Sequence, residues 1–115
     1  MFGLLKKRFG AAAELSARTL ADLLEHDEAI VIDVREPDEF RAGHIAGAAN
    51  QPLSSFDPAT LPAAGAKRLI LNCAGGKRSA MALDRCRLAH MRVGGHLKGG
   101  LAAWTDAGLP LVTGA

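Results

Sequence analysis

The chemistry that this sequence could perform is concentrated in a short run that begins at a cysteine. After a stretch of aliphatic residues the chain reads Cys73, Ala74, Gly75, Gly76, Lys77, Arg78 and Ser79. Because glycine adopts backbone conformations closed to other residues, a turn built on Gly75 and Gly76 can point consecutive N–H groups inward as an anion-binding nest. Such a nest, the start of a following helix and the two cations would all lower the pKa of the thiol. The run therefore predicts a nucleophilic thiolate that handles anions.

The residues of this run have separate expected roles. We expect Cys73 to be the catalytic nucleophile and residues 74–79 to bind the substrate, the glycines through their backbone. Lys77 and Arg78 either attract an anionic substrate or lie in solvent. Ser79 either hydrogen-bonds the sulfur or caps the next helix. Because the nest and the cations already supply activation, this interpretation requires neither a cofactor nor a histidine base.

The length of the loop bears on the kind of anion. Cysteine phosphatases place one more residue between cysteine and arginine, so that the loop wraps a phosphate and the arginine contacts two of its oxygens. Here four residues separate Cys73 from Arg78, and Ser79 stands where a phosphatase would have its arginine. The shorter loop should form a tighter ring, which suits one sulfur atom better than a phosphate.

Four segments, in order, resemble the signatures of the rhodanese family of single-domain sulfurtransferases. They are residues 30–40 (Ile-Val-Ile-Asp-Val-Arg-Glu-Pro-Asp-Glu-Phe), residues 43–48 (Gly-His-Ile-Ala-Gly-Ala), the loop at 73–79, and the closing stretch with Gly99, Gly100, Trp104, Gly108, Leu109 and Pro110. The resemblance implies a double displacement, in which a donor such as thiosulfate leaves a persulfide on Cys73 and a thiol or cyanide removes the sulfur. Its implied partners are these small molecules, or a sulfur-relay protein. Two alternatives are a binding or complex-dependent relay module and, with a similar fold, a phosphatase or arsenate reductase.

The pattern of elements predicts an α/β fold with a central, mostly parallel sheet and helices on both faces. Residues 29–34 and 69–72 are short aliphatic runs typical of strands buried on both sides. Helices are expected at 16–26, 36–41, 78–89 and 101–107, a weaker strand at 93–97, and an irregular connection with one brief helix at 50–66. Because ligands bind outside the carboxyl ends of such strands, Asp33 and Arg35 should meet Cys73 at one edge of the sheet and support the loop.

The second cysteine, Cys86, falls within the helix that should follow the loop. It is either a small buried hydrophobe or a resolving partner for Cys73. Cys86 and His90 lie four residues apart, with His96 further along, but a zinc site usually shows paired ligands at both ends. We therefore expect no metal.

Length and composition indicate one domain. A chain of 115 residues can bury a single core, which we place at residues 13–115 behind a leader at 1–12. The net charge of +2 and the aromatic content of 4% argue against a nucleic-acid partner. The basic and apolar leader does not have the form of a secretory signal, and no apolar run is long enough to cross a bilayer. Together with a reactive free thiol, these features predict a cytoplasmic protein without stable membrane insertion.

Overall fold

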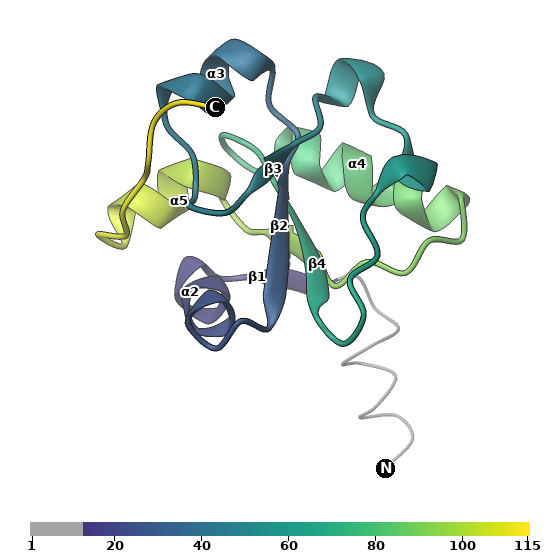
Figure 1. Ribbon diagram of the computed structural model, residues 1–115, viewed down its shortest axis with the longest axis horizontal. Coiled ribbons are helices and arrows are strands. Elements are labelled where there is room, and N and C mark those ends of the chain that lie inside the picture. The colour runs from purple at the N-terminus through teal and green to yellow at the C-terminus, as the bar shows by residue number, and fades with distance from the viewer. Residues whose placement is uncertain (1–12) are drawn as a thin grey trace.

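Short strands alternate with helices along the chain. The computed structural model describes residues 13–115, so the predicted leader at 1–12 lies outside the described residues. The elements, drawn in Figure 1, are β1 (Ala13–Leu15), α2 (Ala17–Glu25), β2 (Ala29–Asp33), α3 (Pro37–Ala42), β3 (Ala49–Asn50), the 3-10 turns η1 (Leu53–Ser55) and η2 (Pro58–Thr60), β4 (Arg68–Asn72), α4 (Lys77–Leu88), β5 (Gly95–Leu97) and α5 (Gly100–Asp106).

The five strands form one parallel sheet in the order β1-β5-β4-β2-β3. β2 and β4 pair along their whole length, so Asp33 lies beside Asn72 at their carboxyl ends. Cys73 follows Asn72 directly, which puts the cysteine loop at this edge of the sheet. The predicted α/β fold, with a parallel sheet between helices, is confirmed.

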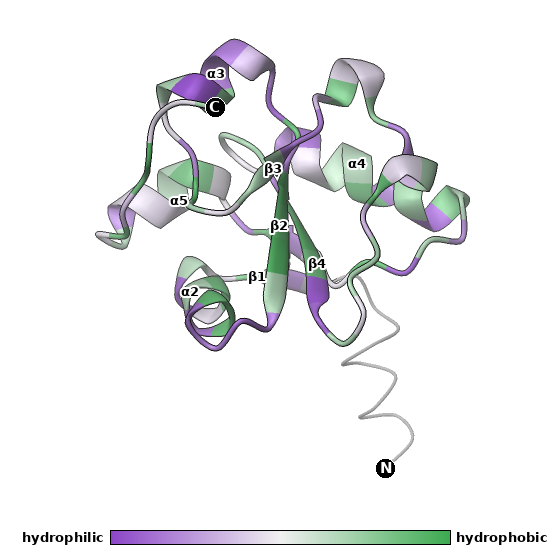
Figure 2. Cartoon of the chain, viewed as in Figure 1, coloured by the Kyte–Doolittle hydropathy of each residue, from purple (hydrophilic) through white to green (hydrophobic). Residues whose placement is uncertain are grey.

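Helices cover both faces of the sheet. In Figure 1, α2 and α5 lie on one side of the sheet and α4 on the other. The buried hydrophobic residues form two clusters, one on each face. The cluster under α2 and α5 includes Leu20, Val31, Ile70, Leu97 and Trp104. The cluster under α4 includes Ile32, Leu71, Cys73, Leu83 and Cys86. Figure 2 shows that β2 is hydrophobic along most of its length, as expected for a strand buried on both faces.

Local signals account for the helix starts. The Ser16 hydroxyl caps α2 by accepting a hydrogen bond from the Thr19 amide at 3.1 Å. At α3, Glu36 and Glu39 form a capping box and Pro37 occupies the first turn.

Two expectations about the elements were wrong, and two short strands were missed. The connection after β3 contains two 3-10 turns rather than one brief helix, because Pro52 and Pro58 each start a separate tight turn. The last strand is shorter than the predicted 93–97 and spans Gly95–Leu97, although the Gly94 amide still donates to the Leu69 carbonyl of β4 at 2.8 Å. Strands β1 and β3, of three and two residues, were not predicted at all.

Candidate active site

The cysteine loop folds as a ring around its own sulfur. The Gly76 amide donates to Cys73 Sγ at 3.0 Å and the Ser79 amide at 3.3 Å, while the thiol donates to Ser79 Oγ at 3.5 Å. Gly76 adopts a φ of +105°, in the left-handed region that favours glycine, and α4 begins at the next residue. Cys73 itself is only 1% exposed. The amides therefore face inward onto an enclosed sulfur, as the nest interpretation requires.

The ring also sets the acidity of the thiol. Burial is the largest single influence and raises the pKa of Cys73. Hydrogen bonds to the sulfur, first from the Ser79 hydroxyl and then from the amides of Ser79, Gly76 and Gly75, act in the other direction and outweigh it. The net pKa lies below the ordinary thiol value, so the loop favours the nucleophilic form.

The start of α5 holds the loop in shape. The Leu101 amide donates to the Cys73 carbonyl at 2.9 Å and the Ala102 amide to the Ala74 carbonyl at 3.0 Å. A Cβ atom at Gly100, whose φ is +58°, would stand 2.4 Å from the Cys73 carbonyl oxygen and 2.6 Å from Ala74. This close approach explains the glycine at position 100, where α5 begins, whereas a Cβ atom at Gly99 would stand 2.9 Å from the Ala103 Cβ.

The two cations of the loop differ in their surroundings. Lys77 is exposed at the rim of the loop. Arg78 instead forms a two-pronged ion pair with Glu39 of α3, at 2.7 and 2.9 Å, and so ties α4 to α3. The Arg78 hydrogen bond is the main cause that lowers the pKa of Glu39 from 4.5 to about 2. Of the two, only Lys77 lacks a carboxylate partner among residues 13–115.

This ion pair should make the protein more sensitive to acid. Because the pKa of Glu39 is depressed on folding, its stabilisation is complete above pH 4.5 and is lost as the pH falls to about 2. Both side chains are at least a third exposed, so we expect Glu39→Gln to lower the free energy of unfolding near neutral pH by about 1 kcal/mol. Urea unfolding at a series of pH values should show this difference shrinking toward pH 2. Asp38→Asn, in the exposed pair with Arg41, is the control and should show little change.

Asp33 and Arg35 form a buried ion pair behind the loop. The guanidinium contacts both Asp33 carboxylate oxygens at 2.9 to 3.2 Å and also donates to the carbonyls of Gly43 and Glu39. Asp33 in turn accepts from the Asn72 side chain at 3.4 Å, next to Cys73 in sequence. Neither side chain contacts the sulfur. Their contacts thus link the end of β2 to the residues of and after α3 and to Asn72 at the base of the loop.

His96, which was considered above only as a weak metal ligand, lies behind Ser79. Its Nδ1 is 2.8 Å from Ser79 Oγ, and its Nε2 is 3.4 Å from the Glu14 carboxylate. His96 is 5% exposed, whereas the Glu14 side chain is 58% exposed. Residues 73, 79, 96 and 14 are therefore joined in one chain of contacts. Sequence reasoning missed this connection because β1, which carries Glu14, gave no recognisable signal.

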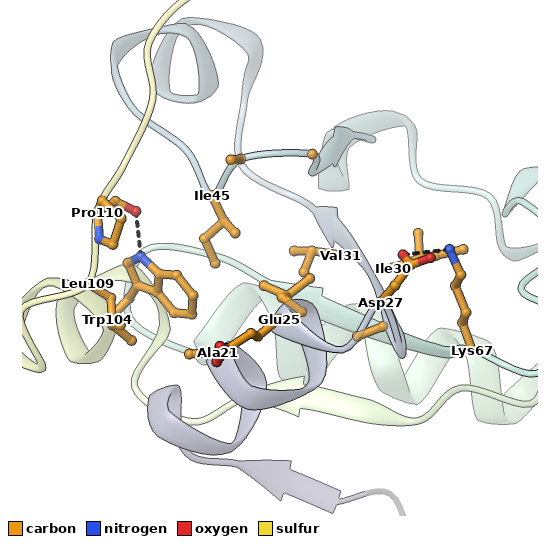
Figure 3. A pocket seen from close by; sticks show the side chains of 14 residues that line it. Ala21, Glu25, Asp27, Ile30, Val31, Ile45, Lys67, Trp104, Leu109 and Pro110 are labelled. Carbon is orange, nitrogen blue, oxygen red and sulfur yellow. Dashed lines mark hydrogen bonds and ion pairs between the residues drawn. The ribbon is translucent and has the colours of Figure 1, made fainter.

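A separate cavity of about 570 Å³ lies at the other end of the strands, beside the starts of β2 and β4 (Figure 3). Trp104 lines it and donates from its indole nitrogen to the Pro110 carbonyl at 2.8 Å, which ties the C-terminal segment to α5. Lys67 pairs with Asp27 at its rim at 2.8 Å. Since Cys73 follows the opposite end of β4, this cavity does not contain the nucleophile.

The second cysteine lies in the apolar cluster under α4. Cys86 is fully buried, and burial raises the pKa of its thiol to about 11. It therefore stays protonated at neutral pH, which favours its interpretation as a small core residue.

Among residues 13–115, no group of three or more His, Cys, Asp or Glu side chains is placed to hold a metal ion. Over the same residues, no helix has the length and apolar character needed to cross a membrane.

Comparison with known proteins decides the family. The model of the rhodanese-like domain matches residues 16–107. The chain belongs to the rhodanese-like family. The resemblance inferred from the four sequence segments is thereby confirmed.

Relatives in sequence and in structure align with most of this chain. An uncharacterized protein of Synechocystis is 44% identical over 98 residues, which are 85% of this chain and 55% of that protein. A rhodanese-related protein from Thermoplasma volcanium is similar in structure with a TM-score of 0.75 and 30% identity, covering 86% of this chain and 96% of that one. A thiosulfate sulfurtransferase from Pseudomonas aeruginosa gives a TM-score of 0.77 at 28% identity over 90% of this chain and 21% of its own. The chain spans about half the length of the first curated relatives that it matches.

Proposed function

We propose that this rhodanese-like protein is a sulfurtransferase that carries sulfane sulfur as a persulfide on Cys73. The observation that supports this most is the ring of amides around the sulfur, with Gly76 N at 3.0 Å and Ser79 N at 3.3 Å. Donors preorganised around a developing negative charge stabilise it without reorganising during the reaction. Residues 74–79 would bind the donor, and Asp33 and Arg35 would support the loop.

In the first half-reaction, the Cys73 thiolate attacks the outer sulfur of a donor such as thiosulfate. A new S–S bond forms to Cys73, the sulfur–sulfur bond of thiosulfate breaks, and its electron pair leaves with sulfite. The outer sulfur of the persulfide then carries negative charge within reach of the inward-facing amides.

In the second half-reaction, an acceptor attacks the outer sulfur and Cys73 leaves as a thiolate. With cyanide the product is thiocyanate, and with a thiol the product is a new persulfide. The leaving thiolate is the form that the loop favours, so the cycle ends in the state in which it began. A free thiolate nucleophile needs a reducing compartment, such as the cytoplasm.

The test is turnover with thiosulfate and cyanide, followed by the appearance of thiocyanate. The wild type should produce thiocyanate, and Cys73→Ser should produce none, while Cys86→Ser should retain most of the activity. Absence of thiocyanate formation, both with thiosulfate and with persulfides as sulfur donors, would contradict the proposal. Hydrolysis of an aryl phosphate that depends on Cys73 would instead support a phosphatase, which the short loop disfavours.

Lys77 should contribute to capture of an anionic donor rather than to the chemical step. Because it is exposed, Lys77→Ala should raise the KM for thiosulfate by about two- to fivefold and leave kcat nearly unchanged. The KM effect should weaken in high salt, since exposed charges are screened. Lys67→Ala, which removes a cation at the other end of β4, is the control. An equal loss in kcat would show that Lys77 acts on the bound transition state.

A further inference from the structure

A line of polar groups leads from the buried sulfur to the protein surface. It runs from Cys73 Sγ to Ser79 Oγ at 3.5 Å, on to His96 Nδ1 at 2.8 Å, and from His96 Nε2 to a Glu14 carboxylate oxygen at 3.4 Å. The first three residues are buried and Glu14 is mostly exposed. Three separate elements are brought together here, since α4 supplies Ser79, β5 supplies His96 and β1 supplies Glu14. In the parallel pairing of β1 with β5, Glu14 stands directly beside His96.

The hydrogens along this line can be arranged in two ways. With a neutral thiol, the Cys73 S–H donates to Ser79 Oγ, and the serine hydroxyl donates to His96 Nδ1 at 2.8 Å rather than to the more distant Gly76 carbonyl at 3.2 Å. If the thiol proton moves to Ser79 while the hydroxyl proton moves to His96, the two bonds that join Cys73, Ser79 and His96 reverse, and the Nε2–H of His96 keeps facing the Glu14 carboxylate. Nδ1–H then donates to Ser79, and the hydroxyl donates to the thiolate. One proton has left the sulfur, one has arrived on the imidazole, and the charges balance as thiolate and imidazolium.

The surroundings of His96 favour this exchange. The imidazolium would have both nitrogens occupied, with Nε2–H facing the Glu14 carboxylate. On its other side in the sheet, β4 presents the apolar Leu71 at the paired position. The helix α4, which packs on β5, contributes the Ser79 hydroxyl, and its other buried titratable side chain, Cys86, stays protonated because burial raises its pKa to about 11. Glu14 and Cys73 are thus the partners that can exchange charge with His96.

We infer that His96 is a positioning residue that accepts the Cys73 proton through the Ser79 hydroxyl, with Glu14 holding the imidazolium that results. The inference rests on the proposed function, because it assigns a route for the proton that the sulfur must lose before it can attack a donor. Cys73 is only 1% exposed, so its sulfur offers little surface from which to release that proton directly. The line through Ser79 and His96 supplies the path to solvent.

The first test measures the reactivity of Cys73 without any sulfur donor. The rate of alkylation by iodoacetamide, followed at Cys73 by peptide mass spectrometry, is recorded against pH. His96→Asn should move the midpoint of this profile up by about one pH unit and slow alkylation near neutral pH about tenfold. Glu14→Gln, at an exposed position, should slow it about threefold, and more at low salt. His90→Asn is the matched control, since His90 is exposed and its positive φ of 57° suits asparagine, and its profile should equal that of the wild type.

The second test observes His96 directly and covers the case in which His96→Asn does not fold. In an NMR titration of the wild type, the His96 ring signals should shift in the same pH range in which Cys73 becomes reactive. The His96 titration should be displaced in Cys73→Ala, because coupling between two sites is reciprocal. An unshifted alkylation profile in folded His96→Asn, or identical His96 titrations with and without the thiol, would overturn the inference.

The outcome for this proton route is separate from the outcome for sulfur transfer. Neither alkylation nor the NMR titration uses thiosulfate or an acceptor. A protein that passes both tests and yet forms no thiocyanate would retain the proton route and refute the proposed function. The reverse result would refute the proton route alone.

Discussion

Gly100→Ala should disable the protein more severely than its small size suggests. The added methyl group would stand 2.4 Å from the Cys73 carbonyl oxygen and 2.6 Å from Ala74, both backbone atoms that cannot rotate away. The loop and α5 would have to separate, with loss of the bonds from Leu101 and Ala102. This clash and the backbone strain of a φ of +58° should together lower the free energy of unfolding by about 3 kcal/mol. Displacement of the amide ring should lower kcat/KM about 100-fold.

A matched glycine separates the two causes. Gly108 also has a positive φ, of +76°, but an added Cβ there would meet no atom within 4 Å. Gly108→Ala should therefore cost only the backbone strain, about 1 to 2 kcal/mol, and keep its sulfur transfer. Urea unfolding and thiocyanate formation measure the two effects. Wild-type turnover in Gly100→Ala would show that docking of α5 does not shape the loop.

Arg35→Met should cost about 3 to 5 kcal/mol in the free energy of unfolding. Arg35 is buried against the fully buried Asp33, and its removal leaves that carboxylate without its charged partner. The bonds to the Gly43 and Glu39 carbonyls are lost as well. Urea unfolding measures the change.

Two comparison variants test this explanation. Arg41→Met removes an exposed ion pair with Asp38 and should change stability by less than about 1 kcal/mol. The double variant Asp33→Leu with Arg35→Met removes both charges, so it should be more stable than Arg35→Met alone. If the double variant is the less stable of the two, the cost does not come from an uncompensated charge.

Much of this protein could be predicted from sequence because the informative features are local. The aliphatic run that became β2, the Ser16 cap of α2 and the glycines beside Cys73 each act within a few residues of the chain. The meeting of Asp33 and Cys73 at one edge then followed from a general rule, since the carboxyl ends of parallel strands lie at the same edge of a sheet.

What the sequence did not reveal depends on contacts between distant residues. The pairing of Arg78 with Glu39 joins positions 39 apart, and neither residue type indicates its partner. The contact of Glu14 with His96 depends on β1, whose three residues are too few for a periodic pattern and gain their strand conformation from β5. His96 consequently reads in sequence as an isolated histidine, and only the fold places it behind Ser79.

The claim on which this account depends is that the amide ring stabilises an electron-rich sulfur bonded to Cys73. Its most direct test is mass spectrometry of the protein after incubation with thiosulfate and removal of the excess donor. The account predicts a gain of one sulfur atom, about 32 Da, on the peptide that contains Cys73, reversed by dithiothreitol and absent in Cys73→Ser. An unmodified Cys73 after exhaustive treatment with thiosulfate and persulfide donors would contradict it.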